Sequence, residues 1–208
     1  MRALIIVDVQ NDFLPGGALA VPHGDEVIPV INRLMPRFEL VVATQDWHPP
    51  DHRSFASQHA GRKVGEVVDL NGLPQLLWPD HCVQNTPGAA LAATLHTTRV
   101  ARVFQKGTDP GIDSYSGFFD NGQRRATNLE EYLRQHSVTD VCLVGLATDY
   151  CVKFTALDAR RLGFDVLVVL DGVRGVELQA GDCVRAVEEM RAAGVQIIRL
   201  AQLELPSS

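Results

Sequence analysis

The segment Ala3-Leu4-Ile5-Ile6-Val7-Asp8 is an unbroken apolar run that ends at an acid. It does not alternate between apolar and polar residues, which is typical of a strand buried on both faces of a sheet. Five more runs of this kind, rich in Val, Ile and Leu and bounded by turn residues, cover residues 39–44, 100–105, 140–145, 164–170 and 195–200. The sequence therefore predicts six buried strands.

The segments between these strands place apolar residues three and four apart, the spacing of an amphipathic helix. The predicted helices cover residues 25–34, 88–95, 128–136, 150–162 and 180–193, and Gly163 and Gly194 stand where two of them should end. Because strands and helices alternate, the sequence predicts an α/β fold: a mostly parallel sheet with right-handed crossovers and helices on both faces. A site in such a fold lies at the carboxyl ends of the strands.

Length and charge limit the class of protein. The chain has 208 residues, of which 46% are hydrophobic, and we expect a single domain, residues 1–208, that needs no disulfide or structural metal to fold. No apolar run approaches the roughly 18 residues of a spanning helix, and the start of the chain lacks the pattern of a signal peptide, so a cytoplasmic protein is expected. The 25 acidic and 19 basic side chains give a net charge of −6 without a basic stripe. This argues against nucleic acid or membrane partners and favours a small molecule.

One long stretch, residues 46–84, does not follow the alternation. It is rich in Pro, His, Gly and Asp, and it holds four of the seven histidines and both tryptophans. Long loops in compact domains are usually functional or disordered, and this aromatic and histidine content favours a function.

The first candidate for chemistry is Asp8, directly after the first predicted strand. A carboxylate at the end of a buried strand is partly desolvated, which raises its pKa and suits it to proton transfer. The alternative is that Asp8 or Asp12 only caps the following turn, since Asp is a common turn residue.

The second candidate is Cys151, which follows the strand and turn Gly145-Leu146-Ala147-Thr148-Asp149-Tyr150 near the start of a predicted helix. The helix dipole and free backbone N–H groups there favour a thiolate nucleophile, and the same N–H groups can hold an oxyanion. All four cysteines are expected to be reduced thiols, and the other three are interpreted as small buried hydrophobes: Cys82, Cys142 and Cys183.

Two further groups follow predicted strands. Lys106, at the end of the third strand, is a cation that could lower the pKa of a neighbouring thiol and orient a carboxylate. Asp46 and His48, two apart after the second strand, point to the same side of an extended backbone, and with His81 they form a set that could bind a transition metal. His52 is a candidate for a further ligand or an outer partner of this set; the alternative is a polar loop with unrelated histidines.

Six motifs stand in one order along the chain: Val7-Asp8-Val9-Gln10-Asn11-Asp12-Phe13, Asp46-Trp47-His48-Pro49, Trp78-Pro79-Asp80-His81-Cys82-Val83, Lys106-Gly107, Asp113-Ser114-Tyr115-Ser116-Gly117-Phe118 and Gly145-Leu146-Ala147-Thr148-Asp149-Tyr150-Cys151-Val152. Together they resemble the nicotinamidase/pyrazinamidase family of isochorismatase-like cysteine hydrolases. The resemblance runs from about residue 1 to residue 199 and is specific, because several separate motifs agree.

The resemblance implies roles for individual residues. Asp8, Lys106 and Cys151 match the family's catalytic triad; Asp46, His48 and His81 match its ligands for one divalent metal, with zinc expected and iron or manganese open. A cis peptide before Ala147 is implied, which would aim the N–H groups of Ala147 and Cys151 into one oxyanion hole. Phe13, Trp78 and Tyr115 match positions that line an aromatic slot for a pyridine ring. The implied fold, a six-stranded parallel sheet with flanking helices, agrees with the alternation of strands and helices.

The predicted activity is hydrolysis of nicotinamide to nicotinate and ammonia through a thioester on the cysteine, serving NAD salvage, with pyrazinamide as a further expected substrate. One rival is another reaction of the broad family, on isochorismate, N-carbamoylsarcosine or a ureido compound. A second rival is a metal-binding or thiol-based sensor without turnover. The sequence leaves open whether the chain forms a homo-oligomer.

Overall fold

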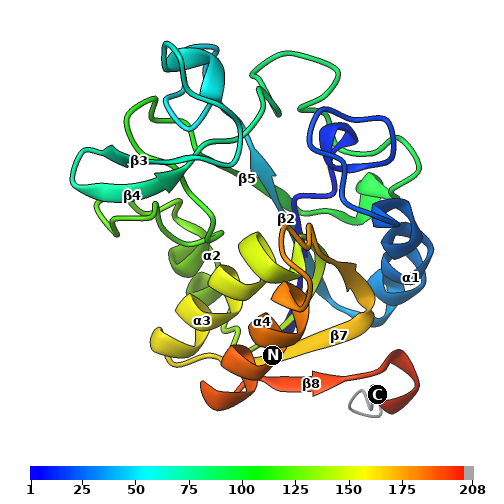
Figure 1. The fold of residues 1–208 in the computed structure, drawn as a ribbon. Helices are drawn as coiled ribbons and strands as arrows, with labels where there is room; N and C mark the ends of the chain where they lie inside the picture. Colours follow the sequence, from blue (N-terminus) through cyan, green and yellow to red (C-terminus); the bar gives the residue numbers. More distant parts are fainter. Residues whose placement is uncertain (204–208) are drawn as a thin grey trace.

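A six-stranded parallel sheet forms the centre of the protein in the computed structural model, which describes residues 1–203 (Figure 1). Its strands lie in the order β5-β2-β1-β6-β7-β8, and every neighbouring pair is parallel. Their bounds are Arg2–Val7 (β1), Leu40–Asp46 (β2), Arg102–Lys106 (β5), Asp140–Leu146 (β6), Asp165–Arg174 (β7) and Gln196–Ile198 (β8). All six predicted strands and the predicted fold class are confirmed; residues 204–208, the end of the predicted domain, lie outside the described residues.

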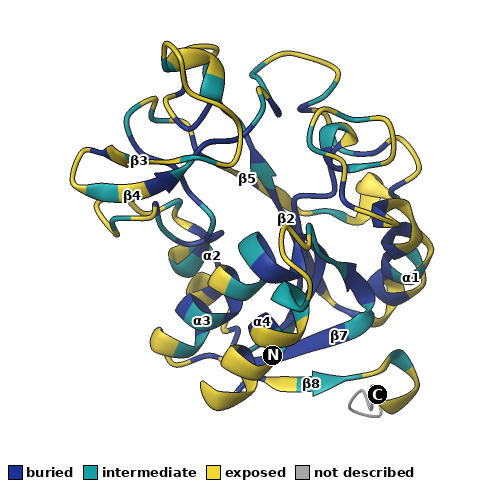
Figure 2. Cartoon of the chain, in the orientation of Figure 1, coloured by how far each residue is buried: buried dark blue, intermediate teal, exposed yellow. Residues whose placement is uncertain are grey.

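Helices cover both faces of this sheet. Helix α1, Val27–Leu34, packs on one face, while α2, Leu129–Gln135, α3, Lys153–Arg161, and α4, Asp182–Ala192, pack on the other. Strand β1 shows why a central strand needs an unbroken apolar run, because its side chains point alternately to the two faces. Leu4 and Ile6 belong to the core under α1. Ala3, Ile5 and Val7 belong to the core under α2, α3 and α4. All five side chains are fully buried; Figure 2 shows β7 as mostly buried, the edge strand β8 as exposed to half-buried and the outer helix faces as exposed.

Two helices end where the sequence predicts. Gly163 and Gly194 follow α3 and α4 with φ angles of 85° and 84°, the left-handed conformation in which glycine is least strained. Nothing lies within 4 Å of an added Cβ at Gly163, so the backbone angle alone favours glycine there. Among the helices of residues 1–203, none has the length and apolar character needed to cross a membrane.

The predicted helix over residues 88–95 is wrong. This segment consists of turns whose backbone groups bond to the chain that follows β1: Asp12 N donates to Gly88 O (3.0 Å), and Ala92 N donates to Val9 O (2.9 Å). Its apolar residues do face the core, since Ala89, Ala92 and Leu95 are buried. The spacing of three therefore reflects successive turns against the core, not a helix.

The stretch 46–84 contains a hairpin that was not predicted. Strands β3, Val67–Leu70, and β4, Leu73–Leu76, pair antiparallel across Asn71 and Gly72, which have φ angles of 55° and 84°. Asn-Gly between two short strands is a strong hairpin signal, because both positions need positive φ. The hairpin lies outside the central sheet (Figure 1).

Candidate active site and metal centre

Three buried side chains meet at the carboxyl edge of the central sheet. Asp8 follows β1, Lys106 is the last residue of β5, and Cys151 follows β6. Lys106 Nζ lies 2.9 Å from Asp8 Oδ2 and 3.4 Å from Cys151 Sγ. The structure therefore brings together the acid, the cation and the thiol that the sequence singles out from three separate strands.

Lys106 is a buried cation between two carboxylates. Its Nζ also pairs with Asp46 and donates to Ser114 O (2.8 Å). Burial alone would lower the pKa of Lys106, but the Asp46 and Asp8 carboxylates hold it well above its ordinary value. Burial raises the pKa of Asp8, and the charge of Lys106 offsets only part of this effect. Asp8 thus has the raised pKa expected from its position, which suits a proton acceptor.

The thiol of Cys151 differs from the sequence-based expectation. The residue lies in a π-helical turn, Thr148–Val152, that precedes α3, and burial raises the pKa of its thiol well above the ordinary value although Lys106 acts in the opposite direction. The expected lowering of the pKa at a helix start is therefore wrong for this chain, because the loss of water outweighs the neighbouring positive charge. The resting thiol is neutral and needs a base to become a nucleophile.

Thr44, which was not predicted as a site residue, orients Asp8. Its Oγ1 donates to Asp8 Oδ1 (2.6 Å), and both side chains are fully buried. With Oδ1 occupied in this way, Asp8 Oδ2 is the oxygen that pairs with Lys106. A polar residue near the end of an otherwise apolar run is the signal that could have indicated it.

Ala147 lies between β6 and Cys151. The peptide bond between Leu146 and Ala147 is cis, as the resemblance implies. Gly145 precedes this bond with φ of 117°, and a Cβ there would collide with the backbone of Val7, so only glycine fits. Ala147 and Cys151 line the same cavity.

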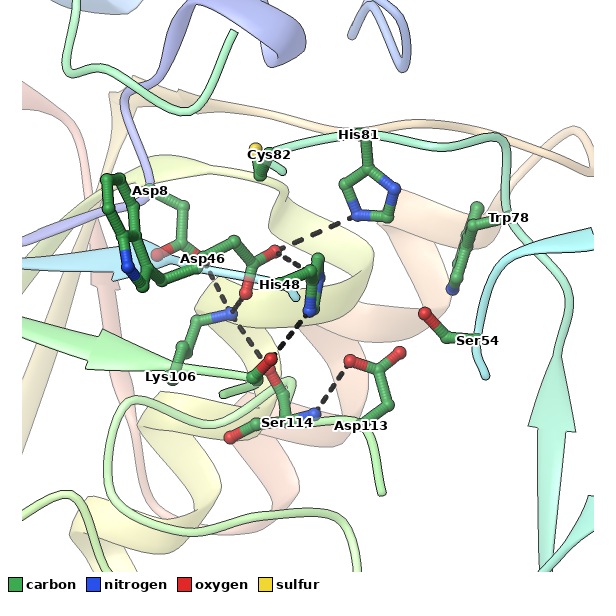
Figure 3. A network of polar contacts seen from close by, with 12 residues as sticks. Asp8, Asp46, His48, Ser54, Trp78, His81, Cys82, Lys106, Asp113 and Ser114 are labelled. Carbon is green, nitrogen blue, oxygen red and sulfur yellow. Dashed lines mark hydrogen bonds and ion pairs between the residues drawn. The ribbon is translucent and has the colours of Figure 1, made fainter. Parts of the chain in front are cut away.

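The three predicted metal ligands form one cluster. Asp46 Oδ2 lies 3.7 Å from His48 Nε2 and 4.0 Å from His81 Nε2, and all three side chains are buried. Figure 3 shows the Asp46 carboxylate between the two imidazoles on one side and Lys106 on the other. Burial would raise the pKa of Asp46, but the positive charge of Lys106 holds it far below its usual value.

The hydrogen bonds of His48 and His81 leave the Nε2 lone pair of each ring free to bind a metal ion. His48 Nδ1 bonds to Gly107 O (2.9 Å) and His81 Nδ1 to Pro79 O (2.7 Å), so each Nδ1 is the protonated nitrogen and donates. His48 Nε2 is buried and has no hydrogen-bond partner within residues 1–203. One carboxylate and two neutral imidazoles, oriented by backbone carbonyls, are a donor set that fits a divalent transition metal.

His52 lies beside this cluster. Its ring centroid is 4.2 Å from that of His48, and its Nδ1 contacts Ser54 Oγ (2.7 Å). Burial and the neighbouring His48 lower the pKa of His52 to about 4, so the ring is neutral. The potential ligand atoms of His52 group with those of His48 and Asp113, and not with those of Asp46 and His81. Whether His52 is a ligand or an outer partner stays a prediction.

A cavity reaches both Cys151 and the metal-ligand cluster. Its walls include the predicted pocket residues Phe13, Trp78 and Tyr115 together with Cys151 and His81. Trp78 Nε1 donates to the hydroxyl of Tyr115 (3.2 Å), which fixes two of the aromatic walls relative to each other. Four lining residues were not predicted as pocket residues: Leu19, Asp113, Tyr150 and Val176. Cys151 and the metal-ligand residues Asp46 and His81 thus share one pocket with aromatic walls and a few polar groups, the composition typical of a small-molecule site.

Comparison with known proteins shows the family of this chain. A family model for the isochorismatase domain matches residues 2–202, so the chain belongs to the isochorismatase family. Within that family it resembles the nicotinamidase of Escherichia coli (strain K12), with 54% identity over 207 residues that cover 98% of this chain and 97% of the relative. The resemblance to nicotinamidases and pyrazinamidases is confirmed.

Solved structures of nicotinamidases and pyrazinamidases also resemble this chain. The nicotinamidase/pyrazinamidase of Acinetobacter baumanii superposes with a TM-score of 0.94 at 43% identity, covering 98% of each chain. The pyrazinamidase of Pyrococcus horikoshii, solved in complex with zinc, superposes with a TM-score of 0.78 at 41% identity and covers 96% of this chain and 99% of its own.

Proposed function

We propose that this protein is a metal-dependent amidase that hydrolyses nicotinamide to nicotinate and ammonia. The observation that carries the proposal is that Cys151, with Asp8 and Lys106 against it, opens into the same aromatic cavity as His81 and Asp46. The identity to nicotinamidases over nearly the whole chain supports it. Pyrazinamide, a similar flat aromatic amide, is a further expected substrate, because an aromatic slot discriminates weakly between isosteres.

The first half of the reaction forms a thioester. Asp8 accepts the proton of the Cys151 thiol while the sulfur attacks the carboxamide carbon. Backbone N–H groups of Ala147 and Cys151 hold the developing oxyanion, an interaction commonly worth about 3–4 kcal/mol per donor. Asp8 then returns the proton to the leaving nitrogen, the C–N bond breaks, and ammonia departs. Lys106 keeps Asp8 in place and stabilises the negative charge on sulfur.

The second half hydrolyses the thioester. Asp8 removes a proton from a water molecule whose oxygen attacks the acyl carbon, and the C–S bond breaks as the sulfur leaves. The proton held by Asp8 returns to the sulfur and restores the neutral thiol of Cys151, while the carboxylic acid formed loses its proton to solvent as nicotinate.

The metal ligands would be Asp46, His48 and His81, which fit a divalent transition metal by their donor types and free lone pairs. A metal ion bound there would supply a Lewis-acid position for the pyridine nitrogen. Zinc is the proposed ion, since the zinc-containing relative has the same fold, while iron and manganese suit the same donors. Phe13, Trp78 and Tyr115 would hold the ring flat, so that the amide carbon faces Cys151.

Ammonia release by the purified protein, supplied with nicotinamide and with zinc, iron or manganese in turn, tests this function. We expect ammonia from nicotinamide, its loss after chelation and its return on adding metal. Cys151→Ala should release no ammonia while still binding nicotinamide. A sensor would release none from the unaltered protein, and turnover of isochorismate or N-carbamoylsarcosine in place of nicotinamide would favour the other branch of the family.

A role in NAD salvage and a cytoplasmic location belong to the same proposal. The four free cysteines, including the proposed nucleophile, suit a reducing compartment. Nucleic acid and membranes have no part in the proposed reaction, and a homo-oligomer stays open.

A further inference from the structure

Asp12 is a carboxylate beside the site that the proposed reaction does not use. Its Oδ2 accepts a hydrogen bond from Cys82 N (2.7 Å), and its Oδ1 accepts one from Ala18 N (3.3 Å). Cys82 is 70 residues away in the sequence, so the interpretation of Asp12 as a cap of its own turn does not account for the shorter bond. The carboxylate joins two distant segments instead.

The first of these segments carries the metal ligands. Cys82 directly follows His81 and has φ of 47°, a left-handed conformation that non-glycine residues adopt infrequently. Its carbonyl accepts the N–H of His48 (3.0 Å). The backbone of Cys82 thus links the two histidine ligands, and its N–H is held by Asp12.

The second segment carries walls of the substrate cavity. Phe13 is next to Asp12, and the backbone carbonyl of Asp12 accepts the N–H of Leu19 (3.0 Å). Both Phe13 and Leu19 line the cavity. The side chain and the main chain of Asp12 therefore hold the cavity wall and the metal-ligand segment at a set separation.

Gly88 provides the space for this carboxylate. Asp12 N donates to Gly88 O (3.0 Å), and a Cβ at Gly88 would collide with the Asp12 carboxylate. The φ angle of Gly88 is not positive, so an alanine there is excluded by the carboxylate and not by the backbone angle. The segment after Cys82 is therefore shaped around Asp12.

We propose that Asp12 is a positioning residue that orients the His81 ligand through the backbone of Cys82 and couples the metal centre to the cavity wall at Phe13 and Leu19. The inference rests on the proposed function, which takes Asp46, His48 and His81 as the metal ligands. Outer partners of metal ligands typically change metal affinity 10- to 100-fold when they are removed.

Zinc affinity, measured by competition with a chromophoric chelator, tests the proposal in the full chain. Asp12→Ala should weaken zinc binding about 10- to 100-fold and raise KM for nicotinamide. Asp12→Asn keeps an oxygen that can accept the Cys82 N–H, so it should restore most of the affinity. The matched control is Asn11→Ala, since Asn11 bonds to Pro87 O (2.8 Å) in the same region but not to Cys82; it should bind zinc like the unaltered protein.

The absorption spectrum of bound Co²⁺ gives an independent readout, because it reports ligand geometry. Asp12→Ala should change this spectrum, whereas Asn11→Ala should not. If Asp12→Ala does not fold, as judged by circular dichroism, Gly88→Ala takes its place, since it displaces the carboxylate while keeping Asp12. It should show the same loss of zinc affinity.

The outcomes separate this inference from the proposed function. If the unaltered protein binds zinc tightly and Asp12→Ala or Gly88→Ala binds it equally well, the role of Asp12 is overturned and the metal centre stands. A loss in Asp12→Ala that Asp12→Asn does not reverse would also overturn the role of the Cys82 hydrogen bond. If the unaltered protein binds no divalent metal, the metal centre and the inference on Asp12 both fail.

Discussion

Replacing Thr44 by valine removes the hydrogen bond to Asp8 while nearly keeping the shape of the side chain. The bond from Thr44 Oγ1 to Asp8 Oδ1 is 2.6 Å long, and both side chains are fully buried. Asp8 Oδ2 would retain Lys106 at 2.9 Å, so the carboxylate loses one of its two partners. The change therefore tests how far the action of Asp8 as a base depends on the hydrogen bond from Thr44.

The expected size of the effect follows from the charge of the acceptor. Hydrogen bonds to charged groups contribute about 1.5–3 kcal/mol. If the full free energy of that hydrogen bond is lost from the transition state, kcat falls about 10- to 150-fold, because about 1.4 kcal/mol corresponds to each factor of ten in rate. The same loss of stability, at about 2–4 °C per kcal/mol for a chain of this size, lowers Tm by about 3–12 °C. Ammonia release at saturating nicotinamide gives kcat, and thermal unfolding followed by circular dichroism gives Tm.

Thr155 offers a matched control. It is also fully buried, its Oγ1 accepts the N–H of Gly117 (2.9 Å), and an added Cβ at Gly117 would touch the methyl groups of both Thr44 and Thr155. Thr155→Val should lower Tm but leave kcat unchanged, and Thr44→Ser should restore most of the activity. A kcat within twofold of the unaltered protein in Thr44→Val, or an equal loss in Thr155→Val, would refute the role given to Thr44.

Two other changes test the cavity wall and the helix ends. Trp78→Phe keeps an aromatic wall but removes the N–H donated to Tyr115, a bond worth about 0.5–1.5 kcal/mol. We expect KM for nicotinamide to rise about 2- to 12-fold at unchanged kcat; a change confined to kcat would contradict the role of Trp78 in binding. Gly163→Ala places a side chain at φ of 85° in open space, so it should cost roughly 1–2 kcal/mol in urea denaturation with unchanged activity. Unaltered stability would show that the backbone angle is not the reason for glycine.

The six strands and four of the five predicted helices follow from the sequence because burial on both faces and amphipathic packing are local demands. Every position of β1 from Ala3 to Val7 faces one of the two cores, so an apolar residue is required at each. The segment 88–95 shows where this reasoning fails, since turns that bury every third side chain imitate a helix. Its backbone partners, Val9 and Asp12, are about 80 residues away in the sequence, and no local pattern contains them.

The sequence by itself also determined which residue types stand at the carboxyl ends of the strands: Asp8, Asp46, Lys106 and, after a turn, Cys151. Only the tertiary structure decided how they interact. Lys106 lies between two carboxylates because β5, β2 and β1 are neighbours in the sheet. The thiol is neutral at rest because burial outweighs the neighbouring cation. Hydrogen bonds such as those of Thr44 and Asp12, and the loss of water around a charge, depend on residues that only folding brings together.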